Sequence, residues 1–235
     1  MKTRVLVPEW MDAPDLGRED HHSALRGLGR INHWTRNAAL VWRHVAALAR
    51  RLSRKRLRIL DVATGGADVP LRMLQYARRL GIELEIHATD VSPQALEFAA
   101  ANCDRAGVSL RLLTLDVLRE EIDERYDLVM CSQFLHHLTD DQTAFALRNM
   151  AGAAVHRVVA VDLVRSRWNW WQVWLATRAL SRSKIVHFDG PQSIRAAYTV
   201  REMATLAREI GFVDFAITRH WPCRFVLVGD LDDRD

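Results

Sequence analysis

The sequence has few cysteines and no long apolar run. Its three cysteines, Cys103, Cys131 and Cys223, are too few and too far apart for a disulfide framework, and no CxxC pair is present to hold zinc. No apolar stretch approaches the roughly 20 residues that cross a bilayer. The first ten residues hold too short an apolar stretch for a secretory signal. We therefore expect a cytoplasmic protein with free, mostly buried thiols.

The remaining composition is that of a globular chain able to bury a large core. Of 235 residues, 49% are hydrophobic and 26% charged, which favours one domain with a modest cap. The net charge of +4 comes almost entirely from arginine and gathers in residues 50–58, which could meet phosphates. A solvated helix end explains the same run, because cations near a helix C-terminus complement its dipole. We expect no nucleic-acid partner, and no pattern indicates the oligomeric state.

Short apolar runs alternate with segments of helical spacing along most of the chain. Strands that alternate with helices form right-handed βαβ units and a mainly parallel sheet with helices on both faces. We therefore predict an α/β fold with a seven-stranded sheet whose last two strands form an antiparallel hairpin. The predicted strands are residues 58–63, 83–90, 108–115, 126–131, 156–163, 212–218 and 224–228. The predicted helices are residues 22–33, 37–52, 69–80, 93–106, 140–150 and 200–210, the last ending at Gly211.

Two regions lie outside this alternation. Residues 1–53 are predicted as an N-terminal helical lead-in and cap, beginning with about twenty extended polar residues, and residues 54–235 as the main domain. Within that domain, residues 165–199 interrupt the pattern after the fifth strand. Such an insertion lies at the C-terminal end of a strand, where open α/β sheets bind ligands. We therefore expect residues 165–199 to form a second cap.

The turn after the first strand has unusually small side chains. A ligand can approach a backbone closely only where side chains are small or missing. Residues 59–70 provide a strand, an acidic residue, a small-residue turn and the start of a helix. The small residues of this turn are Ala63, Gly65, Gly66 and Ala67. The turn therefore has room for a cofactor.

An acidic residue ends each of the first three predicted strands. Asp61 ends the first strand, and Asp90 ends the second at a position where a carboxylate can accept hydrogen bonds from both ribose hydroxyls. Asp116 ends the third strand, where it could meet an adenine amino group. A single such residue is most often a helix cap or turn former. Three on successive strands of one sheet indicate an adenosyl site.

This pattern resembles the class I methyltransferases, the seven-stranded Rossmann-like family that uses S-adenosylmethionine (SAM) and releases S-adenosylhomocysteine (SAH). The DxGxGxG-like loop of that family is matched by residues 61–67, where Gly65 keeps its glycine and Ala63 and Ala67 replace the other two. Alanine suits these positions if they do not require a positive φ. The resemblance covers residues 58–164 well and the final hairpin loosely.

The resemblance implies a role for each acidic residue. Asp61 and the glycine loop would hold the methionine end of SAM, Asp90 the ribose and Asp116 the adenine. The other cofactor contacts that it implies are Ala63, Gly65, Val91, Val117 and Ser132. A nicotinamide site would instead require GxGxxG directly after the first strand, which residues 63–68 do not supply.

A histidine pair follows the fourth strand. Residues 135–138, Leu-His-His-Leu, resemble a motif of small-molecule methyltransferases and align with the catalytic-histidine segment of plant phenol O-methyltransferases. The resemblance implies that His136 is the general base, since imidazole can take a phenolic proton near neutral pH. A histidine that packs or hydrogen-bonds without reacting is the alternative. His137 is expected to order the loop or contact substrate.

Residues at the tip of the fourth strand also exclude some classes of methyl acceptor. Residues 131–134 lack the Asn/Asp-Pro-Pro-aromatic tetrapeptide of enzymes that methylate nucleobase amino groups. They also lack the clustered carboxylates that magnesium needs, and Asp162 and Asn169 are too few on their own, so no metal is expected. We predict O-methylation of a small hydrophobic aromatic acceptor, a phenol or quinol. The alternatives are carbon methylation of a quinone or polyketide ring, RNA methylation through residues 50–58, and a non-catalytic adenosyl-binding module.

The second cap carries the remaining candidates. Its four tryptophans predict a lid over an aromatic substrate, a cap helix packed on the domain, or a helix weakly attracted to an anionic membrane surface by flanking arginines. Residues 187–191, His-Phe-Asp-Gly-Pro, indicate either a substrate contact through His187 or a simple turn. Trp34 is a third substrate candidate, because residues 32–36 are expected to close over the cofactor and substrate. The tryptophans are Trp168, Trp170, Trp171 and Trp174, and the arginines are Arg165, Arg167 and Arg178.

Overall fold

The computed structural model describes residues 1, 3–13, 15–210, 212 and 214–231. The predicted helix stop at Gly211 lies outside them. The helices are α1 (Arg18–Trp34), α2 (Asn37–Arg51), α3 (Asp68–Arg79), α4 (Pro93–Ala106), α5 (Asp140–Ala153), α6 (Arg167–Leu180), α7 (Lys184–Ala196) and α8 (Val200–Ile210), with 3₁₀ turns η1 (Trp10–Asp12) and η2 (Leu135–His137). The strands are β1 (Arg56–Val62), β2 (Glu83–Asp90), β3 (Arg111–Thr114), β4 (Tyr126–Ser132), β5 (Ala154–Leu163), β6 (Asp214–His220) and β7 (Arg224–Asp230).

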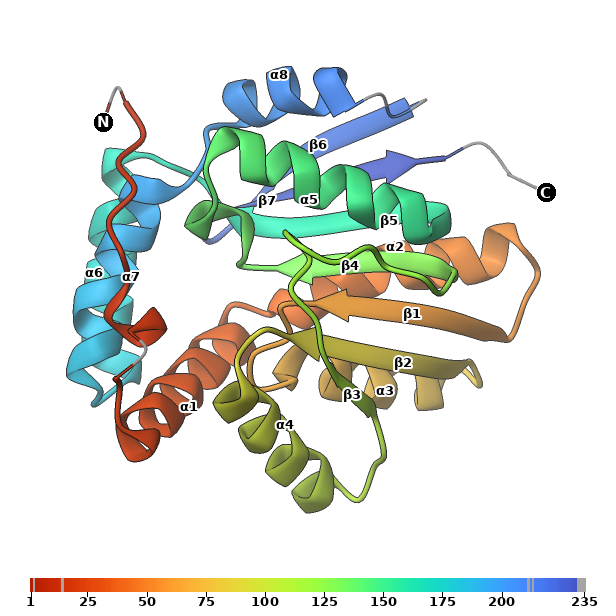
Figure 1. Ribbon diagram of the computed structural model, residues 1–235, viewed down its shortest axis with the longest axis horizontal. Helices are drawn as coiled ribbons and strands as arrows, with labels where there is room; N and C mark the ends of the chain where they lie inside the picture. The colour runs from red at the N-terminus through yellow and green to blue at the C-terminus, as the bar shows by residue number, and fades with distance from the viewer. Residues whose placement is uncertain (2, 14, 211, 213, 232–235) are drawn as a thin grey trace.

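The seven strands form one sheet in the order β3-β2-β1-β4-β5-β7-β6 (Figure 1). Strands β1 to β5 are parallel, so their C-terminal ends share one edge. Strand β7 runs antiparallel to β5 and to β6, which makes β6 and β7 the hairpin expected from the sequence. The predicted Rossmann-like fold is confirmed.

Helices bury an apolar face of the sheet on each side. On one side, Val45 and Leu48 of α2 share a core with Ile59 of β1 and Met130 of β4. On the other side, α5 and α8 pack over β4, β5 and β7. Helix α2, which the sequence assigned to the N-terminal segment, therefore contributes to the main core.

A further layer covers the C-terminal ends of the parallel strands. Helices α1, α6 and α7 and residues 3–13 lie there, on the left of Figure 1. Arg4 holds the N-terminal segment in place, because its guanidinium donates to the backbone oxygens of Leu138 (2.5 Å) and Ala196 (2.5 Å) and pairs with Asp140 (2.9 Å). The edge where open α/β sheets bind ligands is thus covered by the N-terminal segment and α1 together with α6 and α7, which come much later in the sequence.

Local sequence explains several helix boundaries and one error. The side chain of Ser92 caps α4, with Pro93 at the first helical position as predicted. The predicted turn at residues 187–191 is wrong, because these residues lie inside α7. A Cβ at Gly190 would lie 2.5 Å from Thr177, so this glycine lets α7 pack closely on α6. The prediction of about twenty extended residues at the start is also too long, since α1 begins at Arg18.

Three arginines of the basic run after α2 pair with acidic residues on or just before neighbouring strands. Arg54 pairs with Asp127, Arg56 with Glu85, and Arg58 with Glu124. These pairs lie near the start of β1, at the edge opposite to the capped one. They offset part of the positive charge on which the RNA alternative was based, and that alternative stays a prediction. All three cysteines are buried and free, as predicted. Across the described residues, no helix is both long and apolar enough to cross a bilayer.

Candidate active site

The loop between β1 and α3, at the C-terminal edge of the sheet, has a left-handed backbone conformation at every second residue. Ala63, Gly65 and Ala67 have φ values of 55°, 55° and 56°, which lie in the left-handed region. Alanine was expected to suit these positions only if they do not require a positive φ, and both alanines have one. A non-glycine residue in this conformation costs roughly 1–2 kcal/mol, because its Cβ approaches the following carbonyl. The loop therefore keeps its shape at a cost in stability.

Replacing Ala63 with glycine is expected to stabilise the protein. The glycine relieves the left-handed strain and loses part of that gain to the greater entropy of the unfolded chain, leaving roughly 0.5–1 kcal/mol. Urea denaturation of the two proteins measures the difference. Ala101→Gly in α4 is the matched control, since a glycine inside a helix is expected to lower stability by about 1 kcal/mol. A loss of stability in Ala63→Gly would contradict the strain.

Two of the three predicted acids meet at this loop. The carboxylate of Asp61, 2% exposed, accepts a hydrogen bond from the Thr64 hydroxyl at 2.6 Å. Asp90 accepts the backbone N–H of Gly65 at 2.8 Å and that of Ser92 at 2.9 Å. Burial raises the pKa of Asp61 to about 7. The hydrogen bond from Thr64 acts to lower this pKa, and the nearby charges of Asp68 and Asp90 raise it by a smaller amount. The site therefore holds a carboxyl group that a bound cation would help to ionise.

The stability of the protein is expected to depend on pH through Asp61. Because the pKa of Asp61 is raised in the folded state, the folded protein holds this proton more tightly than the unfolded chain does. The resulting contribution to the free energy of unfolding is fully present below about pH 4 and is lost as the pH rises through 7. Asp61→Asn should therefore be more stable than the native protein at pH 8, on the order of 1–3 kcal/mol, and equal to it near pH 4. Thermal unfolding at the two pH values tests this, with Asp123→Asn, on an exposed loop, as the control. An unchanged difference across pH would contradict the burial effect.

The other predicted cofactor residues differ in their surroundings. Asp116 follows β3 at the same edge, but its carboxylate accepts the Leu118 N–H at 3.0 Å and lies 3.4 Å from Arg119. Val117 is buried in the core beneath α5, whereas Val91 is 62% exposed beside the Asp90 carboxylate. The Ser132 hydroxyl accepts a hydrogen bond from Asn37 at 2.6 Å.

The residues at this edge fit an adenosyl cofactor. The cradle combines small side chains, left-handed backbone and carboxylates from two adjacent strands. Two buried polar atoms nearby, Asn37 Oδ1 and Arg224 Nε, have no hydrogen-bond partner in the protein. Unsatisfied buried polar atoms are rare and call for an explanation such as a ligand.

His136 is buried at the tip of β4 and held by an aspartate from β5. Its Nδ1 lies 2.6 Å from Asp162 Oδ1, and its backbone N–H donates to Asp162 Oδ2 at 3.1 Å. Burial alone would raise the pKa of Asp162, but the His136 ring and the N–H of Leu163 hold it below its usual value. An ionised carboxylate only accepts, so in the neutral form of the ring, the form that can act as a base, the proton lies on Nδ1. Nε2 is then left with a lone pair.

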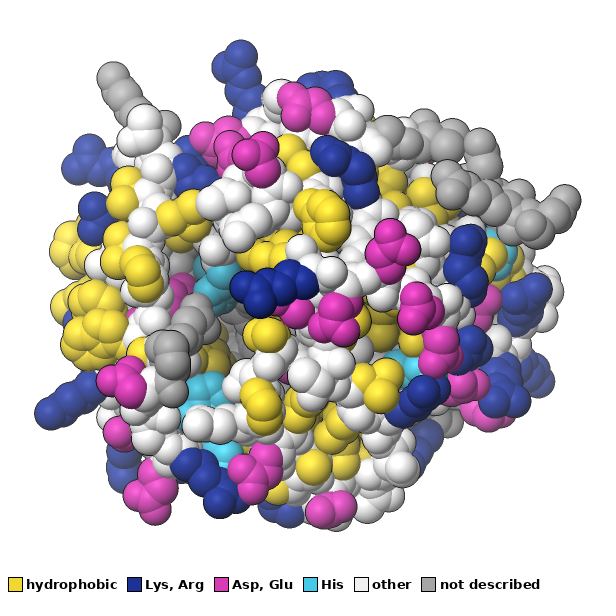
Figure 2. All heavy atoms as spheres, in the orientation of Figure 1, with side chains coloured by type: hydrophobic (Ala, Val, Ile, Leu, Met, Phe, Trp, Pro, Cys, Tyr) yellow, Lys and Arg dark blue, Asp and Glu magenta, His cyan; other side chains and the backbone are white. Residues whose placement is uncertain are grey.

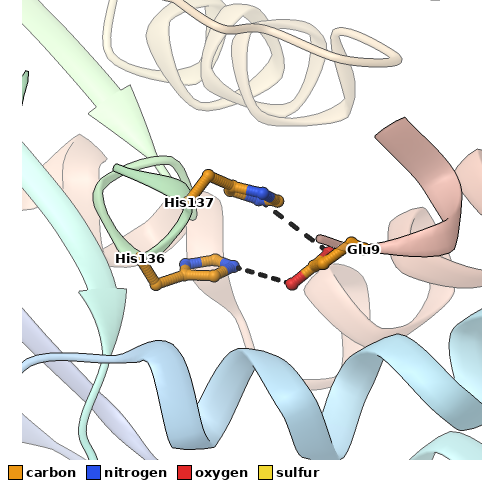
Figure 3. Close-up of side chains that lie close together, drawn as sticks. All are labelled: Glu9, His136 and His137. Atoms are coloured by element: carbon orange, nitrogen blue, oxygen red, sulfur yellow. Dashed lines mark ion pairs between the residues drawn. The ribbon is translucent and has the colours of Figure 1, made fainter. Parts of the chain in front are cut away.

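Glu9 faces His136 Nε2 from the N-terminal segment. Figure 3 shows His136 and His137 side by side, both directed at the Glu9 carboxylate. The distances are 3.7 Å from His136 Nε2 and 4.0 Å from His137 Nε2, and the Ser193 hydroxyl donates to Glu9 at 2.5 Å. The ligand atoms of the three residues lie within 4.8 Å of one another, a spacing at which they could hold one metal ion. Glu9 is 127 positions away from His136 in the sequence, so no local pattern links them.

The other predicted substrate residues lie further from this cluster. His187 Nε2 bonds to the backbone oxygen of Ser181 at 2.8 Å, within the α6–α7 connection. Trp34 is 70% exposed, while its neighbour Asn32 is buried and bonds to Gln133 at the tip of β4. Both roles stay predictions. Of the residues 32–36 expected to close the site, Asn32 is the one that the structure joins to it.

The tryptophans of the second cap divide between core and surface. Trp170 packs against Leu163 and Ile194, whereas Trp168 and Trp171 are 71% and 57% exposed on one stripe of α6. Hydrophobic side chains gather at the left of Figure 2, where Figure 1 places α6 and the N-terminal segment. Packing of a cap helix thus accounts for part of the cluster. Attraction of the exposed stripe to a membrane surface stays a prediction.

Known proteins resemble this chain in sequence and in fold. Residues 59–157 match the family described as "Methyltransferase domain". An 88-residue stretch is 32% identical to the ubiquinone biosynthesis O-methyltransferase of Shewanella sp. (strain ANA-3), covering 37% of this chain and 35% of that enzyme. The chain therefore spans about a third of the curated relative that it matches.

Solved structures share the fold at low sequence identity. Magnesium protoporphyrin IX methyltransferase from Synechocystis, with bound SAH, superposes with a TM-score of 0.57 at 14% identity, covering 86% of this chain and 87% of that one. An O-methyltransferase family 2 protein from Planctomyces limnophilus, in complex with apigenin, gives a TM-score of 0.54 at 17% identity, covering 74% and 49%.

Proposed function

We propose that this chain, which contains a class I SAM-dependent methyltransferase domain, methylates a hydroxyl group of a small, largely hydrophobic aromatic acceptor. The observation that carries the proposal is the buried His136, whose Nδ1 lies 2.6 Å from Asp162 and whose Nε2 faces the capped edge of the sheet. Such a base fits a phenol or quinol acceptor, because the proton of the acceptor hydroxyl must leave as its oxygen attacks.

The cofactor would be held along the edge formed by β1, β2 and β3. Asp90 would bind the ribose, the loop around Gly65 the methionine end, and Asp116 the adenine. When bound, SAM supplies a methyl group on a positively charged sulfur. Asp61, buried beneath the loop, stabilises that positive charge as it ionises.

The acceptor would lie between the tip of β4 and the N-terminal segment. His136 Nε2 takes the hydroxyl proton, and Asp162 stabilises the imidazolium that results. Methyl transfer is an in-line displacement, so much of the rate comes from aligning oxygen, methyl and sulfur, which can supply several kcal/mol. Residues 3–13, α6 and α7 exclude water from this alignment.

The comparisons support the oxygen acceptor only by analogy. The Shewanella relative is named an O-methyltransferase, and the Planctomyces protein was crystallised with apigenin. No observation on this chain favours a carbon acceptor over an oxygen acceptor, so product analysis decides between them.

The test has two parts. Calorimetry with SAH measures cofactor binding, and turnover of labelled SAM is followed on a panel of phenols, quinols and quinones, with mass analysis of the product. EDTA is present throughout, because a metal on His136 Nε2 would occupy the lone pair that the proposed step needs. SAH binding with O-methylated product supports the proposal. Carbon-methylated product, or binding without turnover on any acceptor, would overturn it in favour of the corresponding alternative.

A further inference from the structure

Arg224, the first residue of β7, is a buried cation with weak partners. It is 3% exposed. Its Nη1 donates to the Pro222 carbonyl at 3.4 Å and its Nη2 to Asn32 Oδ1 at 3.3 Å, both long for a charged donor. Its Nε has no partner in the protein. The guanidinium therefore has unused hydrogen-bonding capacity in the interior.

Other arginines with mostly buried side chains are paired. Arg4 lies 2.9 Å from Asp140, Arg157 lies 2.7 Å from Asp230, and Arg165 lies 2.5 Å from Glu202. Within the part of the chain that the structure describes, no ion pair reaches Arg224, and Asp68 and Asp162 act on it only from a greater distance. Burial lowers the pKa of Arg224 to about 10, which leaves it charged at neutral pH. A buried charge without a counterion is costly, so the position calls for an anion.

The surroundings of Arg224 place it at the proposed cofactor site. Asn32 Oδ1 also accepts from Gln133, the residue after β4. Asn32 and Arg224 both oppose the burial that raises the pKa of Asp68, the residue that follows the small-residue loop and begins α3. Arg224 thus joins a network that links the loop after β1 to the tip of β4. This region holds a cation and, at a greater distance from it, the Asp68 carboxyl, an arrangement that suits a ligand carrying both a carboxylate and an ammonium group.

We propose that Arg224 binds the carboxylate of a ligand at this edge of the sheet. The guanidinium fork matches a carboxylate in shape and charge, and the unpartnered Nε supplies one of the two donors of a bidentate pair. The α-carboxylate at the amino-acid end of SAM is one source of this group, and a carboxylate on the acceptor is the other. The inference rests on the proposed function only in placing a ligand here.

Two binding experiments distinguish the sources. Calorimetry compares SAH with 5′-methylthioadenosine, which keeps the adenosyl thioether and lacks the amino acid, for the native chain and for Arg224→Met. A loss of affinity of at least tenfold for SAH with less than twofold for 5′-methylthioadenosine assigns the carboxylate to the cofactor. The second experiment compares 4-hydroxybenzoate with phenol in the presence of SAH, and a loss confined to 4-hydroxybenzoate assigns it to the acceptor.

Stability separates a binding role from a structural one. Truncating an arginine that holds the fold together lowers the stability of the protein. Truncating a buried, unpaired arginine should not lower it. The melting temperature of ligand-free Arg224→Met is therefore expected to equal or exceed that of the native protein, and that of Arg165→Met, which loses the pair with Glu202, to fall. Arg224→Lys keeps the charge without the fork and should recover only part of the affinity.

The outcomes are separable from those of the proposed function. If the native chain fails to bind SAH, the proposed function is overturned. If it binds SAH while Arg224→Met binds SAH and 4-hydroxybenzoate as tightly as the native chain, the role of Arg224 is overturned and the function stands. A fall in the melting temperature of Arg224→Met together with equal losses for all four ligands would indicate a structural residue and also overturn it.

Discussion

Replacing His136 with alanine is expected to lower kcat by about 10²–10⁴-fold while leaving SAH affinity within about twofold. The ring is buried at the proposed acceptor position, whereas Asp61 and Asp90, which are proposed to face the cofactor, follow other strands. Single-turnover kinetics with saturating SAM and an acceptor found in the panel would measure the loss, and calorimetry the affinity.

His44→Ala provides the matched control for this change. His44 lies on α2, which covers one face of the sheet, near Arg157, His220 and Asp230. It should keep full activity. If His136→Ala retains native turnover across the pH range, His136 has only a structural role.

Asp162→Asn is expected to cause a loss of similar size, about 10²–10⁴-fold in kcat, although the ring of His136 remains. The carboxylate keeps the proton on Nδ1, whereas an amide can donate to Nδ1 and so place the proton on Nε2. The base would then face the acceptor in its protonated tautomer. Steady-state kinetics at several pH values would measure the loss.

The double variant His136→Ala/Asp162→Asn tests whether the two residues act as a unit. If Asp162 acts through His136, the double variant is no slower than His136→Ala alone. Losses that multiply would show that Asp162 has a separate role. The melting temperature of each variant is measured alongside, because both residues are buried.

The fold was predictable because its signals are local and repeated. Apolar runs and helical spacing alternate, and Ser92 and Pro93 give the start of α4. The error at residues 187–191 has a tertiary cause. The Asp-Gly-Pro signal is typical of a turn, but Gly190 is used to let α7 approach Thr177 of α6, and Pro191 is tolerated within that helix.

The site was predictable only where its residues follow strands. Asp61 and Asp90 end neighbouring parallel strands, so topology alone brings them to one loop. The contact of Glu9 with His136, like that of Asn32 with Arg224, joins segments far apart in the sequence. Such contacts depend on how the caps pack, which neither spacing nor composition records. Asp162 was noticed only as a metal ligand, and its position beside His136 follows from the pairing of β4 with β5.

The anchoring of Arg4 has a consequence for the order in which the active site is assembled. Arg4 binds the backbone of residues 135–138 and of Ala196, so one side chain joins three widely separated stretches of the polypeptide. A growing chain on the ribosome, or a folding intermediate in which only the central sheet has formed, lacks this clamp and leaves the proposed acceptor position uncovered. Competence for turnover should therefore arise late in folding, after the cofactor cradle.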